Sequence, residues 1–230
     1  MKKGITIMLA AMLLTMGSAY AVNFEDTKGH WAEATIDILV EKGIVDGITD
    51  TTFEPDAEVT RAQYLKMIME ATGLETTPYR AGECLEVKQA DWYAPYLQKA
   101  LDCGLIPESM IAGYKQNVEY TVDENGKATE SKVVYSGAFN GDLHISREEM
   151  AVLTQYCYQY TRTVLTNKET DLSDVNTFND DETISSWAKQ SVKMAVANGF
   201  IEGSDNNMFN PKDATTRAQA ATVISRVISK

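Results

Sequence analysis

The stretch TRAQYLKMIMEA, residues 60–71, decides the fold of this chain because it returns twice in related form. It recurs as SREEMAVLTQYC at 146–157 and as TRAQAATVISRV at 216–227. Each copy opens with Ser or Thr and has Gln or Glu three residues later, which is the pattern of a capping box at a helix start. Apolar residues then recur at helical spacing, and Cys157 occupies one of these apolar positions. The pattern predicts three capped helices. Phe53, Phe139 and Phe209, each seven residues before a cap, are predicted core residues.

Three tryptophans mark an earlier helix in each copy. Trp31, Trp92 and Trp187 are each followed twelve residues later by a glycine, and apolar residues recur one, five, eight and nine positions after each tryptophan. This spacing predicts an amphipathic helix of about three turns, closed by the glycine at its C-terminal cap. The chain therefore consists of three repeats, each made of a helix, a loop and a capped helix.

The middle repeat carries an insertion. The tryptophan and the arginine of the capped helix are 30 residues apart in repeats one and three, but 55 apart in repeat two. The extra residues include two alternating segments, Asn117 to Val122 and Ala128 to Tyr135, on either side of Asn125-Gly126. Because Asn-Gly between alternating segments is a strong hairpin signal, we expect a small β-hairpin at about residues 113–138.

Five landmarks occur in the same order in repeats one and three. In repeat one they are Phe24-x-Asp26, Trp31-Ala32, Gly43-Ile44-x-x-Gly47, Phe53-x-Pro55 and Thr60-Arg61-Ala62-Gln63. In repeat three they are Phe178-x-Asp180, Trp187-Ala188, Gly199-Phe200-Ile201-x-Gly203, Phe209-x-Pro211 and Thr216-Arg217-Ala218-Gln219. Together they resemble the S-layer homology (SLH) domain. Repeat two departs from the pattern, with Val87 in place of the aspartate, Glu108 in place of the second glycine and Glu148 in place of the alanine.

The resemblance implies a mainly α fold of three helix-loop-helix repeats in a pseudo-threefold arrangement around a central three-helix bundle, with the hairpin inserted in repeat two. We place a signal peptide at 1–21, repeat one at 22–80, repeat two at 81–166 and repeat three at 167–230. Proteins of this family bind secondary cell-wall polymers, which are often pyruvylated and are linked to peptidoglycan. The resemblance thus implies a secreted, non-catalytic protein that binds a cell-wall polysaccharide non-covalently and anchors itself or a partner to the bacterial wall or S-layer.

Repeats one and three carry the binding motif of the family, and we expect repeat two to have a mainly structural role. The implied polysaccharide-binding residues are Thr60, Arg61, Gln63, Thr216, Arg217, Gln219, Trp31, Trp187, Gly47 and Gly203, with a smaller part for Arg147. Physical chemistry supports this choice, since a helix start offers unpaired N–H groups and a partial positive charge to an anion. A guanidinium can bind a carboxylate bidentately, a glycine lets the backbone approach a ligand, and an indole can stack on a sugar ring.

Each of these residues also has a purely structural interpretation. The tryptophans can be core residues of their helices, and the threonines are helix caps whatever else they do. The arginines can be ordinary solvated or salt-bridged side chains. The cysteines, Cys84, Cys103 and Cys157, are an odd number for an exported chain; they can all be small buried residues, or Cys84 and Cys103 can form a bridge.

The first 21 residues have the form of a secretory signal peptide, with Lys2 and Lys3 before an apolar run and an Ala19-Tyr20-Ala21 cleavage site. Removing them leaves 19 basic residues against 33 acidic ones, a net charge of −14. Such a surface repels nucleic acid and anionic lipid. No later stretch is apolar enough for a membrane anchor.

Other functions find little support in the sequence. No nucleophile elbow, zinc-protease helix, phosphate loop or Cys-x-x-Cys pair occurs, so we expect no enzyme, no cofactor and no metal. The alternative that remains is a protein-interaction or surface-lattice module that uses the repeat-two hairpin to contact another surface protein.

Overall fold

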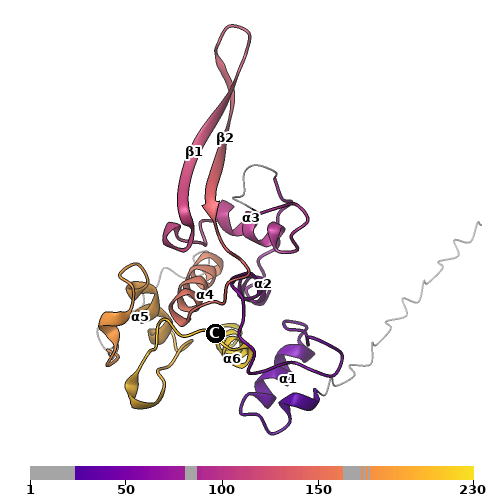
Figure 1. Ribbon diagram of the computed structural model, residues 1–230, viewed down its shortest axis with the longest axis vertical. Coiled ribbons are helices and arrows are strands. Elements are labelled where there is room, and N and C mark those ends of the chain that lie inside the picture. The colour runs from indigo at the N-terminus through magenta and orange to yellow at the C-terminus, as the bar shows by residue number, and fades with distance from the viewer. Residues whose placement is uncertain (1–23, 81–86, 163–171, 173–174, 176) are drawn as a thin grey trace, which may run out of the picture.

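The computed structural model describes residues 24–80, 87–162, 172, 175 and 177–230 (Figure 1). Within these residues the fold is mainly helical, with one two-stranded antiparallel sheet, as the sequence predicts. The α-helices and strands are α1 (Glu33–Glu41), α2 (Arg61–Ala71), α3 (Ala94–Asp102), β1 (Ala112–Val122), β2 (Ala128–Ala138), α4 (Arg147–Arg162), α5 (Lys189–Ala197) and α6 (Arg217–Ile228). Four 3-10 turns accompany them: η1 (Glu25–Thr27), η2 (Glu108–Met110), η3 (Asp181–Thr183) and η4 (Asp205–Asn207). The predicted signal peptide lies outside the described residues. None of the described helices combines the length and the apolar character that a bilayer crossing requires.

The three predicted caps are confirmed. In α2 the Thr60 hydroxyl accepts a hydrogen bond from the Gln63 N–H at 3.2 Å, and the Gln63 side-chain oxygen accepts one from the Thr60 N–H at 2.9 Å. Thr216 and Gln219 form the same reciprocal pair at the start of α6. Because these bonds satisfy donors that a helix start leaves open, they fix where each helix begins.

The three predicted tryptophan-led helices are confirmed as α1, α3 and α5. Each ends at the expected glycine, which takes a positive φ of +67° at Gly43, +65° at Gly104 and +73° at Gly199. The residue after each glycine returns its N–H to a carbonyl of the last turn, as Ile44 does to Leu39 at 2.9 Å. A residue with a Cβ is strained in this left-handed conformation, so the glycine sets the helix end.

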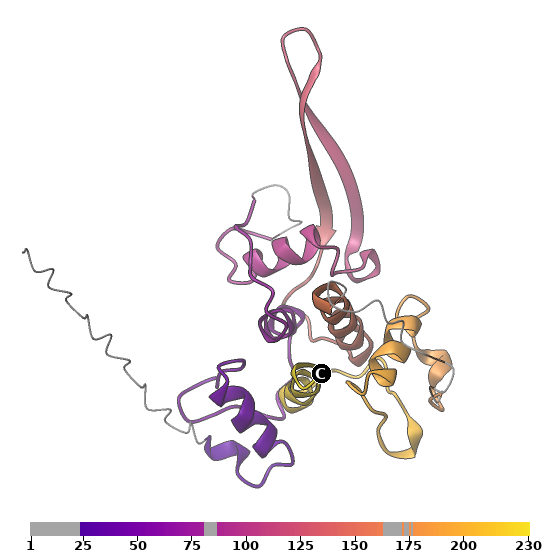
Figure 2. The same ribbon diagram turned by 180° about the vertical axis from the view of Figure 1, so that it is seen from behind.

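The helices pack in a closed order that differs from the order of the repeats. The helix α3 packs against α2, α5 packs against α4, and α1 packs against α6 at the other end of the chain. The capped helices α2, α4 and α6 also contact one another, as both ribbon views show (Figures 1 and 2). The first helix of each repeat therefore rests on the capped helix of the preceding repeat, and the contact of α1 with α6 closes the ring.

Three backbone hydrogen bonds close the same ring between the repeats. The Val59 N–H donates to the Thr215 carbonyl at 2.9 Å, the Thr215 N–H to the Ile145 carbonyl at 3.0 Å, and the Ile145 N–H to the Val59 carbonyl at 2.9 Å. Each of these residues comes directly before a helix cap. The three caps are thus held beside one another by bonds that pass from each repeat to the next.

The predicted core anchors are confirmed, with Phe53, Phe139 and Phe209 no more than 1% exposed. Cys157 is fully buried, and burial raises the pKa of its thiol to about 12, so this thiol stays protonated and unreactive at neutral pH. Cys103 is half-buried, and its thiol donates a hydrogen bond to the Tyr160 hydroxyl at 3.2 Å. The bridge considered for Cys103 involves Cys84, which lies outside the described residues.

The aspartate of the Phe-x-Asp landmark has a structural task. The Asp26 carboxylate accepts hydrogen bonds from the backbone N–H groups of Phe53 and Glu54, the first at 2.9 Å and the second at 2.6 Å. Asp180 makes the same two bonds to Phe209 and Asn210, each at 2.7 Å. Each aspartate thereby holds its repeat's phenylalanine loop against the start of the same repeat.

These bonds predict a pH dependence of stability. Burial acts to raise the pKa of Asp26, but the backbone donors of Phe53 and Glu54 outweigh it and leave that pKa below the ordinary 3.8. The stabilisation is therefore fully present above about pH 4 and is lost as the pH falls through the lowered pKa. We expect Asp26→Asn to lower Tm at pH 7, with the difference from wild type shrinking below pH 4. The exposed Asp50→Asn is the control, and a difference that stays constant down to pH 2.5 would contradict this account.

The predicted hairpin is confirmed at close to its expected bounds, and its strands, of eleven residues each, extend beyond the two alternating segments. The strands β1 and β2 pair antiparallel in a register that places Val118 opposite Val133, and the Asp123 N–H bonds to the Lys127 carbonyl across the turn. The hairpin projects from repeat two as a separate arm (Figure 1).

Candidate functional site

The starts of the capped helices are not open to a ligand. The Arg61 and Ala62 N–H groups donate to the carbonyls of Leu143 and Gly141, at 2.8 and 2.9 Å. Equivalent bonds run from α4 to the loop of repeat three and from α6 to the loop of repeat one. The expectation that these helix starts present unpaired N–H groups to an anion is therefore wrong, because the loop of the neighbouring repeat already occupies them.

Two of the motif arginines connect successive repeats. The Arg217 Nε donates to the Phe53 carbonyl at 2.7 Å and its Nη2 to the Asp46 carbonyl at 2.8 Å. The Arg147 Nε donates in the same way to the Phe209 carbonyl at 2.8 Å, and its Nη2 donates to a loop carbonyl of repeat three at 3.1 Å. Each guanidinium also lies over the ring of that phenylalanine, 4.3 Å away for Arg217 and 5.3 Å for Arg147. These arginines thus hold the repeats together, whichever of them also binds a ligand.

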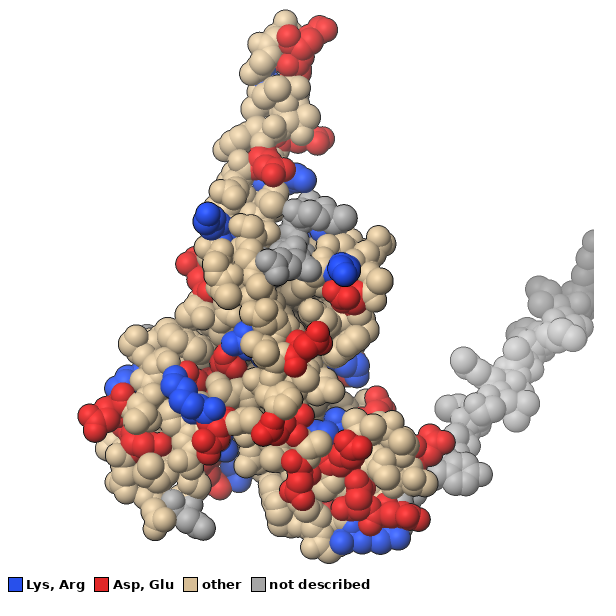
Figure 3. Space-filling view, viewed as in Figure 1, with Lys and Arg blue, Asp and Glu red and all other residues tan. Residues whose placement is uncertain are grey.

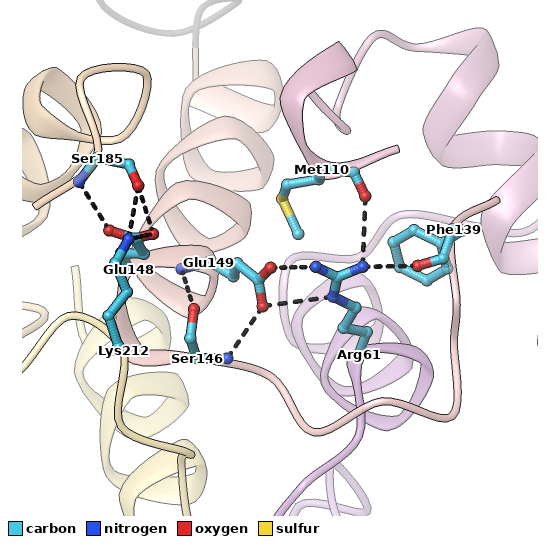
Figure 4. Close-up of polar contacts among 8 residues, drawn as sticks. All are labelled: Arg61, Met110, Phe139, Ser146, Glu148, Glu149, Ser185 and Lys212. Atoms are coloured by element: carbon cyan, nitrogen blue, oxygen red, sulfur yellow. Dashed lines mark hydrogen bonds and ion pairs between the residues drawn. The ribbon is translucent and has the colours of Figure 1, made fainter. Parts of the chain in front are cut away.

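Arg61 is bound differently, because repeat two has a carboxylate where the other repeats have an amide. Its Nη1 donates to the Phe139 carbonyl at 2.8 Å, while Nη2 and Nε face the Glu149 carboxylate in a close ion pair (Figure 4). The side chains of Arg61 and Glu149 are only 14% and 11% exposed. Glu149 also accepts a bond from the Ser146 N–H at 3.0 Å. An internal anion therefore already occupies the guanidinium of Arg61.

The second unusual glutamate of repeat two is also buried. Glu148 accepts hydrogen bonds from the Ser185 N–H at 3.0 Å and from the Ser185 hydroxyl at 2.9 Å, and it forms a close ion pair with Lys212 (Figure 4). Repeat two is thus connected to repeat one through Glu149 and to repeat three through Glu148. The glutamates of repeat two thus place a carboxylate at each of its two junctions.

A pocket of about 150 Å³ lies where the three repeats meet. Its walls come from residues 44–47 of repeat one, from Gln63, Lys66 and Met67 on α2, from Trp92 of repeat two and from Arg217 of repeat three. Three of the predicted binding residues, Gly47, Gln63 and Arg217, therefore come together in one place.

The polar groups of this pocket suit an anion. The Arg217 Nη1 has no hydrogen-bond partner among the described residues, and the side chain lines the pocket. Burial lowers the pKa of Arg217, while Glu54, Asp26 and Asp46 act in the opposite direction; arginine stays charged at neutral pH in such surroundings. The Gln63 amide uses its oxygen for the cap and keeps its two N–H donors.

The remaining walls offer a second cation and a flat apolar surface. The Lys66 amine pairs with Glu70 at 2.8 Å and is about one-third exposed. The Trp92 side chain is 52% exposed, so much of its indole faces solvent. The chain has 33 acidic against 21 basic residues, and on the face drawn in Figure 3 the acidic side chains gather most densely over the lobe of α1. Local geometry, not overall charge, must therefore attract any anionic ligand to this place.

A wider and more open hollow of about 770 Å³ adjoins the pocket. The two share Asp46 and Lys66, and the hollow continues past Glu70 to Tyr96. The Tyr96 hydroxyl donates to Glu70 at 2.6 Å, which fixes this side of the hollow. The pocket and the hollow therefore lie next to each other beside α2.

The other predicted residues lie elsewhere. Thr60, Thr216 and Gln219 form capping boxes, and Arg147 lies half-buried at the junction of repeats two and three. Trp31 is 65% exposed, which rules out the core interpretation for it, whereas Trp187 packs partly against the core.

Packing inside the protein leaves no room for a side chain at either loop glycine, Gly47 or Gly203. A Cβ on Gly203 would lie 2.8 Å from the Phe178 ring, and a Cβ on Gly47 would overlap the Phe24 ring and the Thr49 carbonyl. Neither position tolerates a side chain without a shift of these neighbours. Packing against a phenylalanine therefore explains both glycines, and at Gly47 the backbone borders the pocket as well.

Sequence reasoning missed six of the nine residues that line the pocket, among them Trp92 and Lys66. Trp92 stands at the same landmark as Trp31 and Trp187, but the divergence of repeat two around it argued against a binding role. The repeat pattern could not identify Lys66, because the equivalent positions of the other two repeats hold Val152 and Thr222 and no lysine. The landmark tryptophan alone could have identified Trp92.

Comparisons with known proteins agree with the repeat pattern. Residues 23–65 and 177–221 match the S-layer homology domain, in repeats one and three. An amylopullulanase of Thermoanaerobacterium thermosulfurigenes is 32% identical over 92% of the chain, and the exoglucanase XynX of Acetivibrio thermocellus is 33% identical over 91%. An S-layer protein of Bacillus thuringiensis subsp. finitimus is 27% identical over 95% of the chain.

The chain spans only a small part of each of these relatives. It covers 10% of the amylopullulanase, 16% of the exoglucanase and 23% of the S-layer protein. The two enzymes and the S-layer protein therefore share one segment of about the length of this chain, joined in each to a much larger remainder.

Proposed function

This chain is an S-layer homology domain protein, and we propose that it attaches to the bacterial cell wall by binding an acidic polysaccharide in the pocket between its repeats. Its family and its relatives indicate a secreted protein at the cell surface. The polymer proposed is a secondary cell-wall polysaccharide linked to peptidoglycan, with a pyruvylated sugar as the group that enters the pocket.

The observation that carries this proposal is the convergence of Arg217, Gln63, Lys66 and Trp92 on one pocket. A pyruvyl group brings a carboxylate and an apolar methyl to the same end of a sugar. The free Nη1 of Arg217 and the N–H donors of Gln63 can bind that carboxylate, since charge-assisted hydrogen bonds are the strongest available here. The indole of Trp92 can then cover the apolar face of the ring.

The adjoining hollow gives the polymer a path out of the pocket. We expect the next sugar to lie beside α2, near the shared residues Asp46 and Lys66, with Tyr96 further along the hollow. A carboxylate such as Glu70 can accept hydrogen bonds from sugar hydroxyls. We therefore expect affinity to rise from a single acidic sugar to a short fragment of the polymer.

We also propose that the three repeats are related by pseudo-threefold symmetry, so that equivalent residues of each repeat meet at each of the three junctions. The ring of Val59, Ile145 and Thr215 and the ring of helix contacts support this arrangement. The junction that holds Arg61 is occupied by Glu149 and the one that holds Arg217 is open, so the repeats contribute unequally.

A binding module fits better than an enzyme. This chain matches a segment of its own size in an amylopullulanase, in an exoglucanase and in an S-layer protein, which favours a property other than those two catalytic activities. Attachment is a property that all three could use.

The central experiment is co-sedimentation of the protein with purified cell walls, before and after chemical removal of the acidic polymer. We expect pelleting from intact walls and its loss from stripped walls. A variant that lacks Gln116 to Gly137, and so most of the hairpin, should pellet like wild type, because the pocket lies outside that segment. Equal pelleting with stripped walls would contradict the proposed ligand.

Replacing Trp92 by Ala tests the pocket itself. Because the side chain is half-exposed and lines the pocket, we expect near-normal stability and a loss of wall affinity of about tenfold. Leu143→Ala removes a similarly exposed apolar side chain that does not line the pocket, and it should bind normally. Unchanged binding by the Trp92 variant would move the site away from this pocket.

A further inference from the structure

The hairpin has an apolar face that nothing in the described chain covers. Val118, Tyr120 and Val122 alternate along β1 and therefore point to one side, and they are 49%, 63% and 57% exposed. Val133 lies opposite Val118 in the register and is 37% exposed. Such a contiguous apolar strip on a projecting arm is typical of a contact surface.

The other face of the hairpin carries its charges. Lys115, Asn117, Glu119 and Thr121 alternate along β1, and Glu119 forms an exposed ion pair with Lys132 of β2 at 3.4 Å. The hairpin therefore has two different faces, and any strand added to it must match apolar with apolar residues and charge with opposite charge.

The edge of β1 is the open one. Described residues form a sheet of only two strands, and an isolated pair of strands is marginally stable in water. The basal half of β2 is half-buried, whereas β1 is exposed at ten of its eleven positions. A long exposed edge presents unpaired N–H and C=O groups that can pair with another strand.

The sequence of β1 is complementary to itself. When two copies run antiparallel about Asn117, Lys115 of each lies opposite Glu119 of the other, and Gln116 lies opposite Val118. Residues opposite each other in this register share a face, so the apolar strips of the two copies lie on the same face of the joined sheet. We propose that a second copy of this chain binds here, joining two hairpins edge to edge through β1 into a four-stranded sheet. Such a contact uses the same patch on both partners, as a twofold interface requires.

This proposal is independent of polysaccharide binding, because the pocket contains no hairpin residue. Dimerisation would also place two wall-binding modules in one particle. Two modules bind a polymeric surface more tightly than one, without any new contact to the sugar.

The test measures the mass of the purified chain by sedimentation equilibrium across a range of concentrations. We expect a dimer in wild type and a dissociation constant at least about tenfold weaker in Lys115→Glu, since two favourable cross-strand pairs become repulsive. Lys127→Glu makes the same change of charge at the turn, outside the contact, and should remain dimeric. The double variant Lys115→Glu, Glu119→Lys exchanges the charges between copies and should recover the dimer.

A second measurement reports the register. In a chain with Cys84 and Cys103 replaced by Ser, Asn117→Cys should form a disulfide between copies, because residue 117 faces itself at a distance that a disulfide can span. Asn125→Cys at the tip should not. The proposal is overturned by a monomeric wild type at all concentrations, by a dimer that Lys115→Glu leaves unchanged with its fold intact, or by equal crosslinking at positions 117 and 125.

Discussion

Glu149→Ala is expected to lower the free energy of unfolding by about 3 kcal/mol, the largest stability loss among single changes at the helix caps. The change leaves Arg61 as a buried cation without its carboxylate, and breaking one side of such a pair costs far more than an exposed pair is worth. It also removes the bond to the Ser146 N–H, which completes the cap of α4. For a chain of this size the loss lowers Tm by roughly 10 °C.

Glu149→Gln is the matched control for this prediction. Glutamine is what repeats one and three carry at this position, and its amide oxygen can keep the cap while the charge is lost. We expect a clearly smaller loss than for Ala, measured by urea unfolding of the two variants side by side. Equal losses would mean that the charge of Glu149 alone matters. Negligible losses in both would show that the pair with Arg61 does not stabilise the junction.

Arg217→Ala is expected to weaken binding to intact cell walls by about tenfold to a hundredfold. The change removes the guanidinium that lines the pocket, and a charge-assisted hydrogen bond to a buried anion is worth about 1.5–3 kcal/mol. It also removes the bonds to the Phe53 and Asp46 carbonyls, so stability should fall as well. Binding must therefore be measured at a temperature where unfolding shows the variant to be folded.

Arg147→Ala separates the two effects. Arg147 makes the same kind of bonds to loop carbonyls and lies over Phe209, but it does not line the pocket. We expect the two variants to lose similar stability, with the larger loss of wall affinity in Arg217→Ala. Equal losses of affinity at equal stability would indicate that the arginines act only through the fold, and the pocket at Arg217 would then not be the binding site.

The sequence identified much of the local structure because local signals are strong in this chain. Thr60 and Gln63 are three residues apart, and their bonds depend on the helix start alone, so the capping box could be read directly. The glycine ends of the tryptophan-led helices and the Asn125-Gly126 turn are equally local. The candidate site was predicted in part: Gly47, Gln63 and Arg217 meet in the pocket, whereas Trp31, Trp187 and Gln219 do not line it.

What the sequence by itself determined is therefore the set of repeats, the ends of their helices, the hairpin and the apolar faces that form the core. The tertiary structure decided which helix packs against each apolar face and which groups bind each motif arginine. Arg61 and Arg217 stand in identical tetrapeptides, yet one binds a carboxylate 88 residues away and the other lines an open pocket. The physical reason is range: caps and amphipathic periods arise between residues a few positions apart, whereas the charge and space around a guanidinium depend on side chains that only the closed ring of repeats brings near.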